Sequence, residues 1–140
     1  MVSRIRLLLA DDHLETAEQL RRLLQPEFDV IGHVTDGRKL VEYAERLAPD
    51  VIVSDISMPD VDGITATAAI LRQNPDARIV LVTVHGDPSL VTRGLETGAL
   101  GYVLKCSAGD DLIPAIDAAL RGERHVSEAL HFAFVKAHSR

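Results

Sequence analysis

Four short apolar runs in this chain each end in a polar residue, and that arrangement constrains the fold more than any other feature. The polar ends are the pair Asp11 and Asp12, then Asp55, Thr83 and Lys105. Short, continuously apolar runs are typical of strands buried on both faces of a parallel sheet. Because the carboxyl ends of parallel strands meet at one edge of a sheet, we expect these five side chains to converge there.

Segments with helical periodicity separate the apolar runs. Apolar residues recur every three or four positions in five such segments, which lie at residues 14–24, 40–47, 64–71, 89–97 and about 110–120. A partly alternating run at residues 28–34 predicts an edge strand. Five strands alternating with five helices predict a doubly wound α/β fold, with a parallel sheet in the flavodoxin-like order 2-1-3-4-5.

Two of the predicted helices contain residues that disfavour a helix. Gly94 costs about 1 kcal/mol relative to Ala in a helix interior, so the helix at residues 89–97 is expected to be weak and able to move. Ser107 and Asp110 have the spacing of a capping box. Pro114 conflicts with a start at Ser107, because it lacks an N–H and its ring clashes one turn back. We therefore expect the last helix to begin nearer Asp110 or to be distorted.

Composition argues against several classes of protein. The net charge of −6 argues against nucleic-acid binding by this segment, since phosphate contacts need a basic surface. The single cysteine, Cys106, excludes an internal disulfide. No apolar stretch is long enough for a signal peptide or a membrane span, so we expect a cytoplasmic protein without membrane contact.

The three carboxylates at the predicted sheet edge repel one another unless a cation lies between them. Asp11, Asp12 and Asp55 therefore predict a divalent ion, and Mg²⁺ suits a site with few carboxylates, bound waters and phosphate oxygens. Lys105 and the Thr83 hydroxyl are suited to binding an anion. A metal, an ammonium and a hydroxyl around one carboxylate favour phosphoryl transfer, with Asp55 as the nucleophile because it is alone at its strand end.

These residues also carry a resemblance to a known family. The chain from about residue 4 to residue 122 resembles the receiver domain of bacterial two-component response regulators, through Asp11, Asp12, Asp55, Thr83, Tyr102 and Lys105. The sequences Ala-Asp-Asp-His, Thr-Val-His-Gly-Asp and Gly-Ala-Leu-Gly-Tyr-Val-Leu-Lys are similar to the NarL/FixJ subfamily. Members of that subfamily usually carry a C-terminal helix-turn-helix domain that binds DNA. The resemblance implies a signalling domain that catalyses only its own phosphorylation and dephosphorylation.

The resemblance also implies roles for individual residues. Asp55 would accept a phosphoryl group from a histidine kinase. Asp12, Asp55 and the Ser57 carbonyl would bind Mg²⁺, and Asp11 would hold the ion through water. Thr83 and Lys105 would contact the phosphoryl group.

Thr83 and Tyr102 would act together as a switch pair. Their rearrangement would change the surface made by residues 89–97, by residues 102–105 and by the last helix. That surface, or the C-terminal tail, is the predicted site of a possible homodimer.

The chain departs from the family pattern in a few positions near the site. Val84 is bulkier than the Ala often found there and is expected to narrow access to the phosphoryl group. His85 is a residue that we expect to modulate hydrolysis of the acyl phosphate, and His13 is predicted to be a surface residue. The six histidines show no ligand spacing, so the sequence predicts no zinc site. A cis bond at Lys105–Cys106 would cost about 3–4 kcal/mol, because Cys106 is not Pro.

Two other classes of protein, FMN binders and aspartyl phosphatases, are alternatives that the sequence fits less well. A flavodoxin-like FMN binder needs a donor-rich loop after the first strand, where Asp11 and Asp12 would repel the phosphate. An aspartyl phosphatase usually places Asp-x-Asp there. The only such pair, Asp60 and Asp62, lies in a turn and suits loop geometry or a helix cap. The main alternative to a transcription regulator is a stand-alone response regulator that acts by protein contacts alone.

The end of the chain is predicted to form a separate element. We expect a receiver domain at residues 1–124 and a helical tail at residues 125–140. Leu130, Phe134 and Ala137 fall at helical spacing and predict an apolar stripe. A spare apolar stripe is usually an interface, so we expect a connector toward a DNA-binding domain that this chain lacks, or a dimerisation element in the stand-alone alternative.

Overall fold

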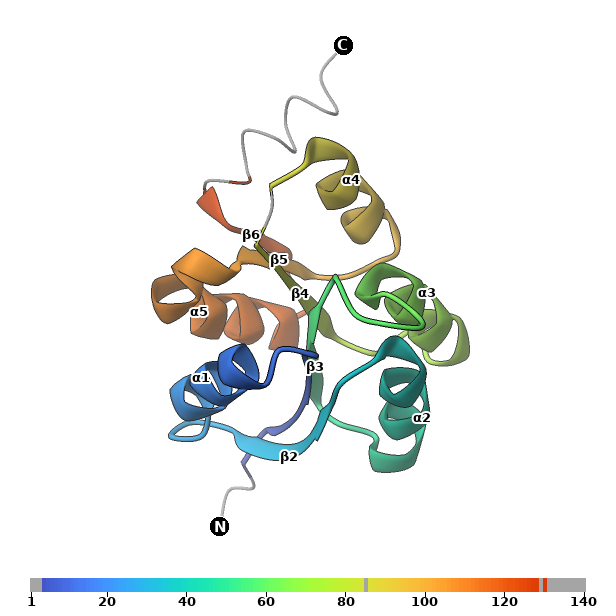
Figure 1. Cartoon of the computed structure of the whole chain (residues 1–140), viewed down its shortest axis with the longest axis horizontal. Coiled ribbons are helices and arrows are strands. Elements are labelled where there is room, and N and C mark those ends of the chain that lie inside the picture. The colour runs from blue at the N-terminus through green and yellow to red at the C-terminus, as the bar shows by residue number, and fades with distance from the viewer. Residues whose placement is uncertain (1–3, 85, 129, 131–140) are drawn as a thin grey trace.

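The computed structural model describes residues 4–84, 86–128 and 130, and Figure 1 shows a parallel sheet with helices on both faces. The strands are β1 (Arg6–Ala10), β2 (Asp29–Val34), β3 (Val51–Asp55), β4 (Ile79–Thr83), β5 (Gly101–Leu104) and β6 (His125–Val126). The helices are α1 (Leu14–Leu24), α2 (Gly37–Leu47), α3 (Gly63–Gln73), α4 (Pro88–Glu96) and α5 (Ala108–Leu120), with a 3₁₀ turn, η1 (Lys105–Ser107), before α5. None of the helices within these described ranges is long and apolar enough to cross a membrane.

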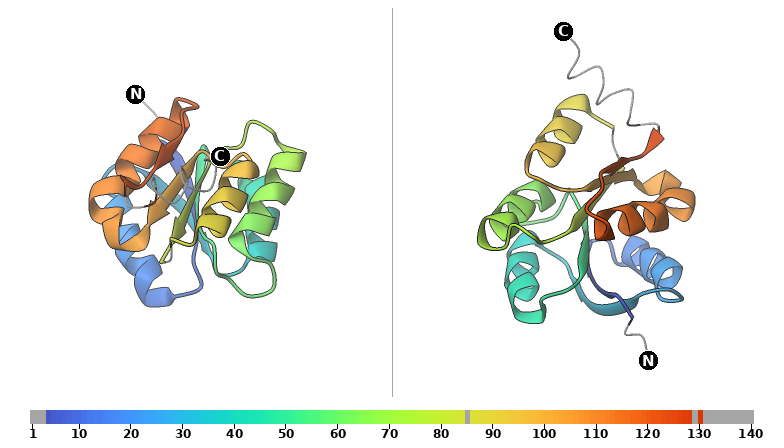
Figure 2. Two further views of the ribbon diagram at one scale, coloured as in Figure 1. Left: turned by 90° about the horizontal axis from the view of Figure 1, so that it is seen from above. Right: turned by 180° about the vertical axis from the view of Figure 1, so that it is seen from behind.

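All strand pairs are parallel, in the order β2-β1-β3-β4-β5-β6. The first five strands follow the predicted order 2-1-3-4-5, which confirms the doubly wound fold. α1 and α5 cover one face of the sheet, and α2, α3 and α4 cover the other (Figures 1 and 2). The strand order reverses between β1 and β3, and ligand sites of doubly wound sheets lie in the crevice at that point.

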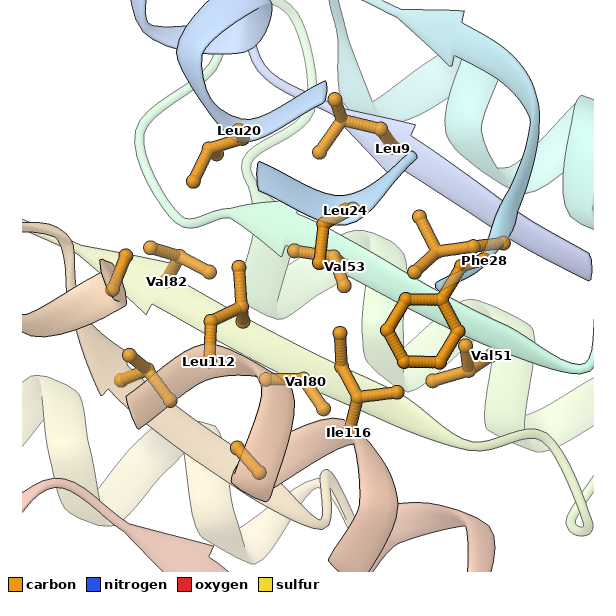
Figure 3. Close-up of a cluster of buried hydrophobic side chains, with 14 of the residues drawn as sticks. Leu9, Leu20, Leu24, Phe28, Val51, Val53, Val80, Val82, Leu112 and Ile116 are labelled. Atoms are coloured by element: carbon orange, nitrogen blue, oxygen red, sulfur yellow. The ribbon is translucent and has the colours of Figure 1, made fainter. Parts of the chain in front are cut away.

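Successive residues of the central strands alternate between two apolar cores. Leu7, Leu9 and Val53 pack on the side of α1 and α5, in the core that Figure 3 shows. Leu8 and Ile52 pack on the opposite side, under α2 and α3. Each of these five side chains is at most 2% exposed, and burial of one such side chain contributes about 1.5–3 kcal/mol. The central strands are therefore held from both faces, which fixes the positions of their C-terminal ends.

The two carboxylates of the turn after β3 have structural roles. Asp62 is the N-cap of α3, and its side chain accepts a hydrogen bond from the Thr65 N–H at 2.8 Å. Asp60 adopts a positive φ of 66°, a conformation that Asp tolerates better than most residues. These observations confirm the predicted turn and cap roles of Asp60 and Asp62.

The start of α5 differs from the prediction. The helix begins at Ala108, two residues before Asp110, and the Ser107 side chain makes no capping hydrogen bond. The backbone of η1 forms the first turn instead, since the Ala108 N–H donates to the Lys105 carbonyl. Pro114 lies inside the helix, where it removes the single hydrogen bond that its N–H would donate to the Asp110 carbonyl.

The sixth strand was not predicted, and it lies where the sequence indicated the start of a helical tail. β6 pairs in parallel with β5, with His125 opposite Gly101 and Val126 opposite Tyr102. A strand of two residues leaves no periodic pattern, and its pairing with β5 is known only from the fold. The segment expected to form a helical tail at residues 125–140 therefore begins with a two-residue strand.

Side-chain hydrogen bonds also connect β6 and Ser127 to α5 and β5. Asp111 of α5 lies 2.6 Å from His125 Nε2 and accepts a hydrogen bond from the Ser127 hydroxyl. The Ser127 hydroxyl oxygen in turn accepts a hydrogen bond from the Leu104 N–H at 3.1 Å. Leu130, the first residue of the predicted apolar stripe, is 1% exposed and belongs to the core under α2–α4. The other stripe residues, Phe134 and Ala137, lie outside the described residues.

Gly63→Ala is expected to lower the free energy of unfolding by about 1–3 kcal/mol or more. A Cβ at Gly63 would lie 2.1 Å from the Asp55 carbonyl oxygen, a backbone atom that cannot rotate away. Gly109→Ala is the matched control, because a Cβ there has no neighbour within 4 Å among the described residues. The control should gain about 0.5–1 kcal/mol from helix propensity. Urea unfolding of both variants tests this, and an unchanged midpoint for Gly63→Ala would contradict it.

Candidate functional site

The register of the sheet brings the predicted site residues to one edge. Ala10 of β1 pairs with Ser54 of β3, so the next residues, Asp11 and Asp55, lie side by side. Thr83 ends β4 and pairs with Leu104 of β5, the residue before Lys105. The predicted convergence is confirmed for Asp11, Asp12, Asp55 and Lys105 by their contacts and for Thr83 by its register.

Lys105 lies between two buried carboxylates. Its Nζ donates to Asp55 Oδ2 at 3.0 Å and to Asp11 Oδ2 at 3.1 Å. The side chains of Asp11 and Asp55 are 0% and 6% exposed. Burial lowers the pKa of Lys105, but its ion pairs with Asp55 and Asp11 outweigh that effect and hold the pKa above its ordinary value. Lys105 is therefore charged, and it offsets much of the repulsion between the two carboxylates.

Asp55 is the carboxylate whose ionisation is most opposed by its surroundings. Burial raises its pKa, and the charge of Asp11 raises it further. The contact with Lys105 and a hydrogen bond from the Ser57 N–H, at 3.3 Å, act in the opposite direction, but the pKa stays above its ordinary value. A cation placed beside Asp55 would favour the ionised form that can act as a nucleophile.

The donor atoms at this edge fit a metal ion. Asp11, Asp12, Asp55 and His13 each offer one ligand atom, and these four atoms lie within 4.8 Å of one another. Asp12 Oδ1 is buried and has no hydrogen-bond partner in the described part of the chain, and a buried acceptor without a partner costs about 1–3 kcal/mol. A cation would satisfy this oxygen. The role of the Ser57 carbonyl as a ligand stays a prediction.

An open pocket of about 540 Å³ gives access to the site. It lies between the β1–α1 loop, the β3–α3 loop and α4, and its walls are Asp12, His13, Ile56, Ser57, Met58, Pro59, Asp62, Ile64, Leu90 and Arg93. Sequence reasoning missed Arg93. The three-residue spacing of Leu90 and Arg93 puts them on one face of a helix, but only the position of α4 turns that face toward the site.

Of the two residues predicted to modulate the site, Val84 and His85, only Val84 belongs to the described part of the chain. Val84 is 62% exposed and lines a separate pocket of about 460 Å³ with Lys105 and Cys106. His85 lies outside the described residues.

The structure has no cis peptide bond in its described ranges, so the Lys105–Cys106 bond is trans.

The predicted switch residues are both buried. Thr83 is 4% exposed and Tyr102 is 0% exposed. Within the described residues, the Tyr102 hydroxyl has no hydrogen-bond partner, and burial, with a smaller contribution from the charge of Asp87, raises its pKa above the ordinary value. A Cβ at Gly94 would lie 2.6 Å from Tyr102 Cε2. Gly94 thus has a packing role that the sequence did not indicate, because it makes room for the tyrosine ring.

Comparison with known proteins bears on the same residues. The model of the response regulator receiver domain matches residues 7–117, which include every described residue of the acidic edge and Lys105. The chain belongs to the response regulator receiver family. Membership confirms the resemblance found in the sequence, and the family match extends from the second residue of β1 through most of α5.

Curated relatives of this receiver are transcriptional regulators. The chain is 36% identical over 140 residues to the transcriptional regulatory protein DegU of Brevibacillus brevis, covering 99% of this chain and 59% of DegU. It is 42% identical over 121 residues to the transcriptional regulatory protein LiaR of Bacillus subtilis strain 168, covering 85% of this chain and 57% of LiaR. The receiver thus spans less than two thirds of the length of these relatives.

Solved structures of related receivers superpose closely on this one. A two-component response regulator of the LuxR family from Aurantimonas sp. SI85-9A1 aligns with a TM-score of 0.90 at 32% identity, covering 96% of this chain and 97% of that chain. The signal receiver domain of the putative response regulator NarL from Mycobacterium tuberculosis aligns with a TM-score of 0.81 at 30% identity, covering 87% and 100%. These matches support the NarL-like assignment as well as the fold.

Asp55→Asn is expected to raise the free energy of unfolding at neutral pH by on the order of 1 kcal/mol in metal-free buffer. The pKa of Asp55 is raised in the folded state, so ionisation destabilises the folded protein relative to the unfolded chain. The gain should therefore vanish below pH about 4, where the carboxyl is neutral in both states, and grow as pH rises through the folded-state pKa. Urea unfolding at several pH values measures it. A gain independent of pH would contradict this electrostatic origin.

Proposed function

We propose that this receiver takes a phosphoryl group from a histidine kinase onto Asp55. The observation that carries the proposal is the arrangement around one nearly buried carboxylate: Lys105 Nζ 3.0 Å from Asp55 Oδ2, and further carboxylates within 4.8 Å. This arrangement supports a nucleophile with a nearby cation and a place for a metal ion. Asp11, Asp12, Asp55 and the Ser57 carbonyl would hold Mg²⁺, which neutralises charge on the phosphoryl oxygens.

The residues of the chain then have separate tasks. A carboxylate oxygen of Asp55 attacks phosphorus, a new O–P bond forms, and the P–N bond to the histidine of the kinase breaks, with the electron pair leaving on the imidazole. The Lys105 ammonium moves from Asp55 Oδ2 to an oxygen of the transferred group. The Thr83 hydroxyl donates to another of those oxygens. Later attack of water on the phosphorus breaks the Asp55 O–P bond, which restores the carboxylate and releases inorganic phosphate. The domain thus catalyses only its own phosphorylation and dephosphorylation.

Incubation with a small acyl phosphate and Mg²⁺ is expected to add one phosphoryl group to the wild-type chain, because the receiver itself supplies the metal site, Lys105 and Thr83. Intact-mass analysis detects the adduct, and Asp55→Asn should abolish it. Asp76→Asn is the matched control, since it makes the same change in an exposed turn away from the acidic edge. An adduct that persists in Asp55→Asn would refute the assignment of Asp55.

We further propose that phosphorylation changes the surface made by α4, β5 and α5. Thr83 would turn toward the phosphoryl group and change the space available to Tyr102. Tyr102 packs against Gly94 of α4, so movement of the ring would be transmitted directly to that helix.

Gly94→Ala is expected to displace the Tyr102 ring, because the added methyl carbon would lie 2.6 Å from Cε2. The chain has only two tyrosines, so fluorotyrosine labelling gives two fluorine NMR signals. The Tyr102 signal should shift in Gly94→Ala and, separately, in wild type on phosphorylation. Tyr43, whose ring contacts Arg46 on α2, is the internal control. A Tyr102 signal that is unchanged by phosphorylation would count against the switch.

In the whole protein, we propose that this receiver controls transcription through a DNA-binding domain joined after the receiver, with homodimerisation through the α4–β5–α5 surface or the C-terminal segment. The support is that the relatives DegU and LiaR are transcriptional regulatory proteins. A stand-alone regulator acting through protein contacts is the second candidate, because β6 and Leu130 pack on this domain. Sequencing the reading frame beyond residue 140 distinguishes a following helix-turn-helix from a stop codon.

A further inference from the structure

His13 points its imidazole toward the carboxylates of the site. His13 Nδ1 lies 3.2 Å from Asp12 Oδ1, 3.6 Å from Asp11 Oδ1 and 3.9 Å from Asp55 Oδ2. Its side chain is 64% exposed and makes no hydrogen bond that caps α1. The sequence predicted a surface residue, which the exposure bears out, but the direction of the ring follows only from the conformation of the β1–α1 loop.

The distances from His13 Nδ1 to these oxygens are compatible with ligands that share one small cation. Zn²⁺ binds nitrogen and carboxylate oxygen at about 2.0–2.2 Å, which places the ligand atoms of a tetrahedral site about 3.4 Å apart. The distances from His13 Nδ1 to the three oxygens, 3.2–3.9 Å, are close to that value. In addition, Asp12 Oδ1 is buried and makes no hydrogen bond within the described residues, although His13 Nδ1 lies 3.2 Å from it, so both atoms are available to a metal ion between them.

We propose that His13 gives this receiver a second metal-binding mode, in which a late first-row divalent ion such as Zn²⁺ is held by His13, Asp11, Asp12 and Asp55. Mg²⁺ is a hard cation that prefers oxygen ligands and keeps several waters, so it gains little from an imidazole. Zn²⁺, Co²⁺ and Ni²⁺ bind imidazole well. Both classes of ion would bind the same aspartates, and His13 would raise the affinity only for Zn²⁺, Co²⁺ and Ni²⁺.

Histidine spacing along the sequence does not reveal such a site. Zinc sites recognised by spacing take several ligands from short motifs, whereas here one imidazole joins carboxylates from the ends of two neighbouring strands, β1 and β3. The site is assembled by the register of the sheet rather than by a local motif.

The zinc mode has a consequence that rests on the proposed function. An ion bound to Asp55 Oδ2 competes there with the Lys105 ammonium, which lies 3.0 Å from the same atom. A Zn²⁺ ion with four protein ligands also has no open position for a phosphoryl oxygen. Zn²⁺ should therefore inhibit phosphorylation of Asp55 in the presence of Mg²⁺. Removal of the imidazole should weaken this inhibition by Zn²⁺.

The test is calorimetric titration of the full chain with Zn²⁺ and, separately, with Mg²⁺. His13→Ala should lower the Zn²⁺ affinity at least about tenfold, since residues that merely orient metal ligands already contribute about 10- to 100-fold. The Mg²⁺ affinity should change less than about twofold. His125→Gln is the matched control, because His125 also contacts a carboxylate, that of Asp111, away from the acidic edge. The control should bind Zn²⁺ at the acidic edge as wild type does.

Co²⁺ provides a second readout that does not depend on phosphorylation. Visible absorption of bound Co²⁺ reports the loss of a nitrogen ligand, so the spectrum of His13→Ala should differ from that of wild type and of His125→Gln. An unchanged Zn²⁺ affinity and Co²⁺ spectrum in His13→Ala would overturn the proposal. Equal losses of Zn²⁺ and Mg²⁺ affinity would also overturn it, since they indicate only a general change at the carboxylates. Failure of Asp55 phosphorylation with Mg²⁺ alone would refute the proposed function while leaving these binding results decisive.

Discussion

The Lys105 ammonium lies between two carboxylates that are almost entirely buried, and the functional edge of this sheet depends on that contact. Asp11 and Asp55 are held next to each other by the β1–β3 register, so their repulsion cannot be relieved by rotation into water. A buried charge left without its partner typically costs about 3–5 kcal/mol. The ion pair between Lys105 and Asp11 joins residues 94 positions apart in the chain. It thereby couples the position of η1, which begins at Lys105, to that of β1, which Asp11 follows.

The fold was predictable because the strands and helices carry strong, regular signals. The central strand β4 is apolar up to its last residue, Thr83. Its alternate residues pack into two different cores, so a change of register would misplace both sets of side chains. β6 was not predictable, because a two-residue strand has no period and depends on the exposed edge of β5. The start of α5 was misjudged because the η1 turn supplies backbone hydrogen bonds that a capping motif would otherwise provide.

The chemical identity of the site was predictable for a related reason. Parallel strands end at one edge, so any polar residue that directly follows an apolar run is placed there by topology alone. Residues that reach the site from loops and helices are not placed in this way. His13 depends on the conformation of the β1–α1 loop, and Arg93 depends on the position of α4. Gly94 was read as a weak point of its helix, whereas the structure gives it a packing reason, the ring of Tyr102.

β5 connects the site to the C-terminal segment through its backbone. Its last residue, Leu104, directly precedes Lys105, and the Leu104 N–H donates to the Ser127 hydroxyl oxygen, which in turn donates to Asp111. Two residues earlier, the Tyr102 carbonyl accepts a hydrogen bond from the Ser127 N–H at 2.9 Å. Ser127 is 1% exposed, so these bonds are not readily replaced by water. A displacement of Lys105 therefore acts on Leu104, whose N–H is hydrogen-bonded to Ser127 of the C-terminal segment. A displacement of Tyr102 acts on Ser127 as well, through the hydrogen bond to the Tyr102 carbonyl.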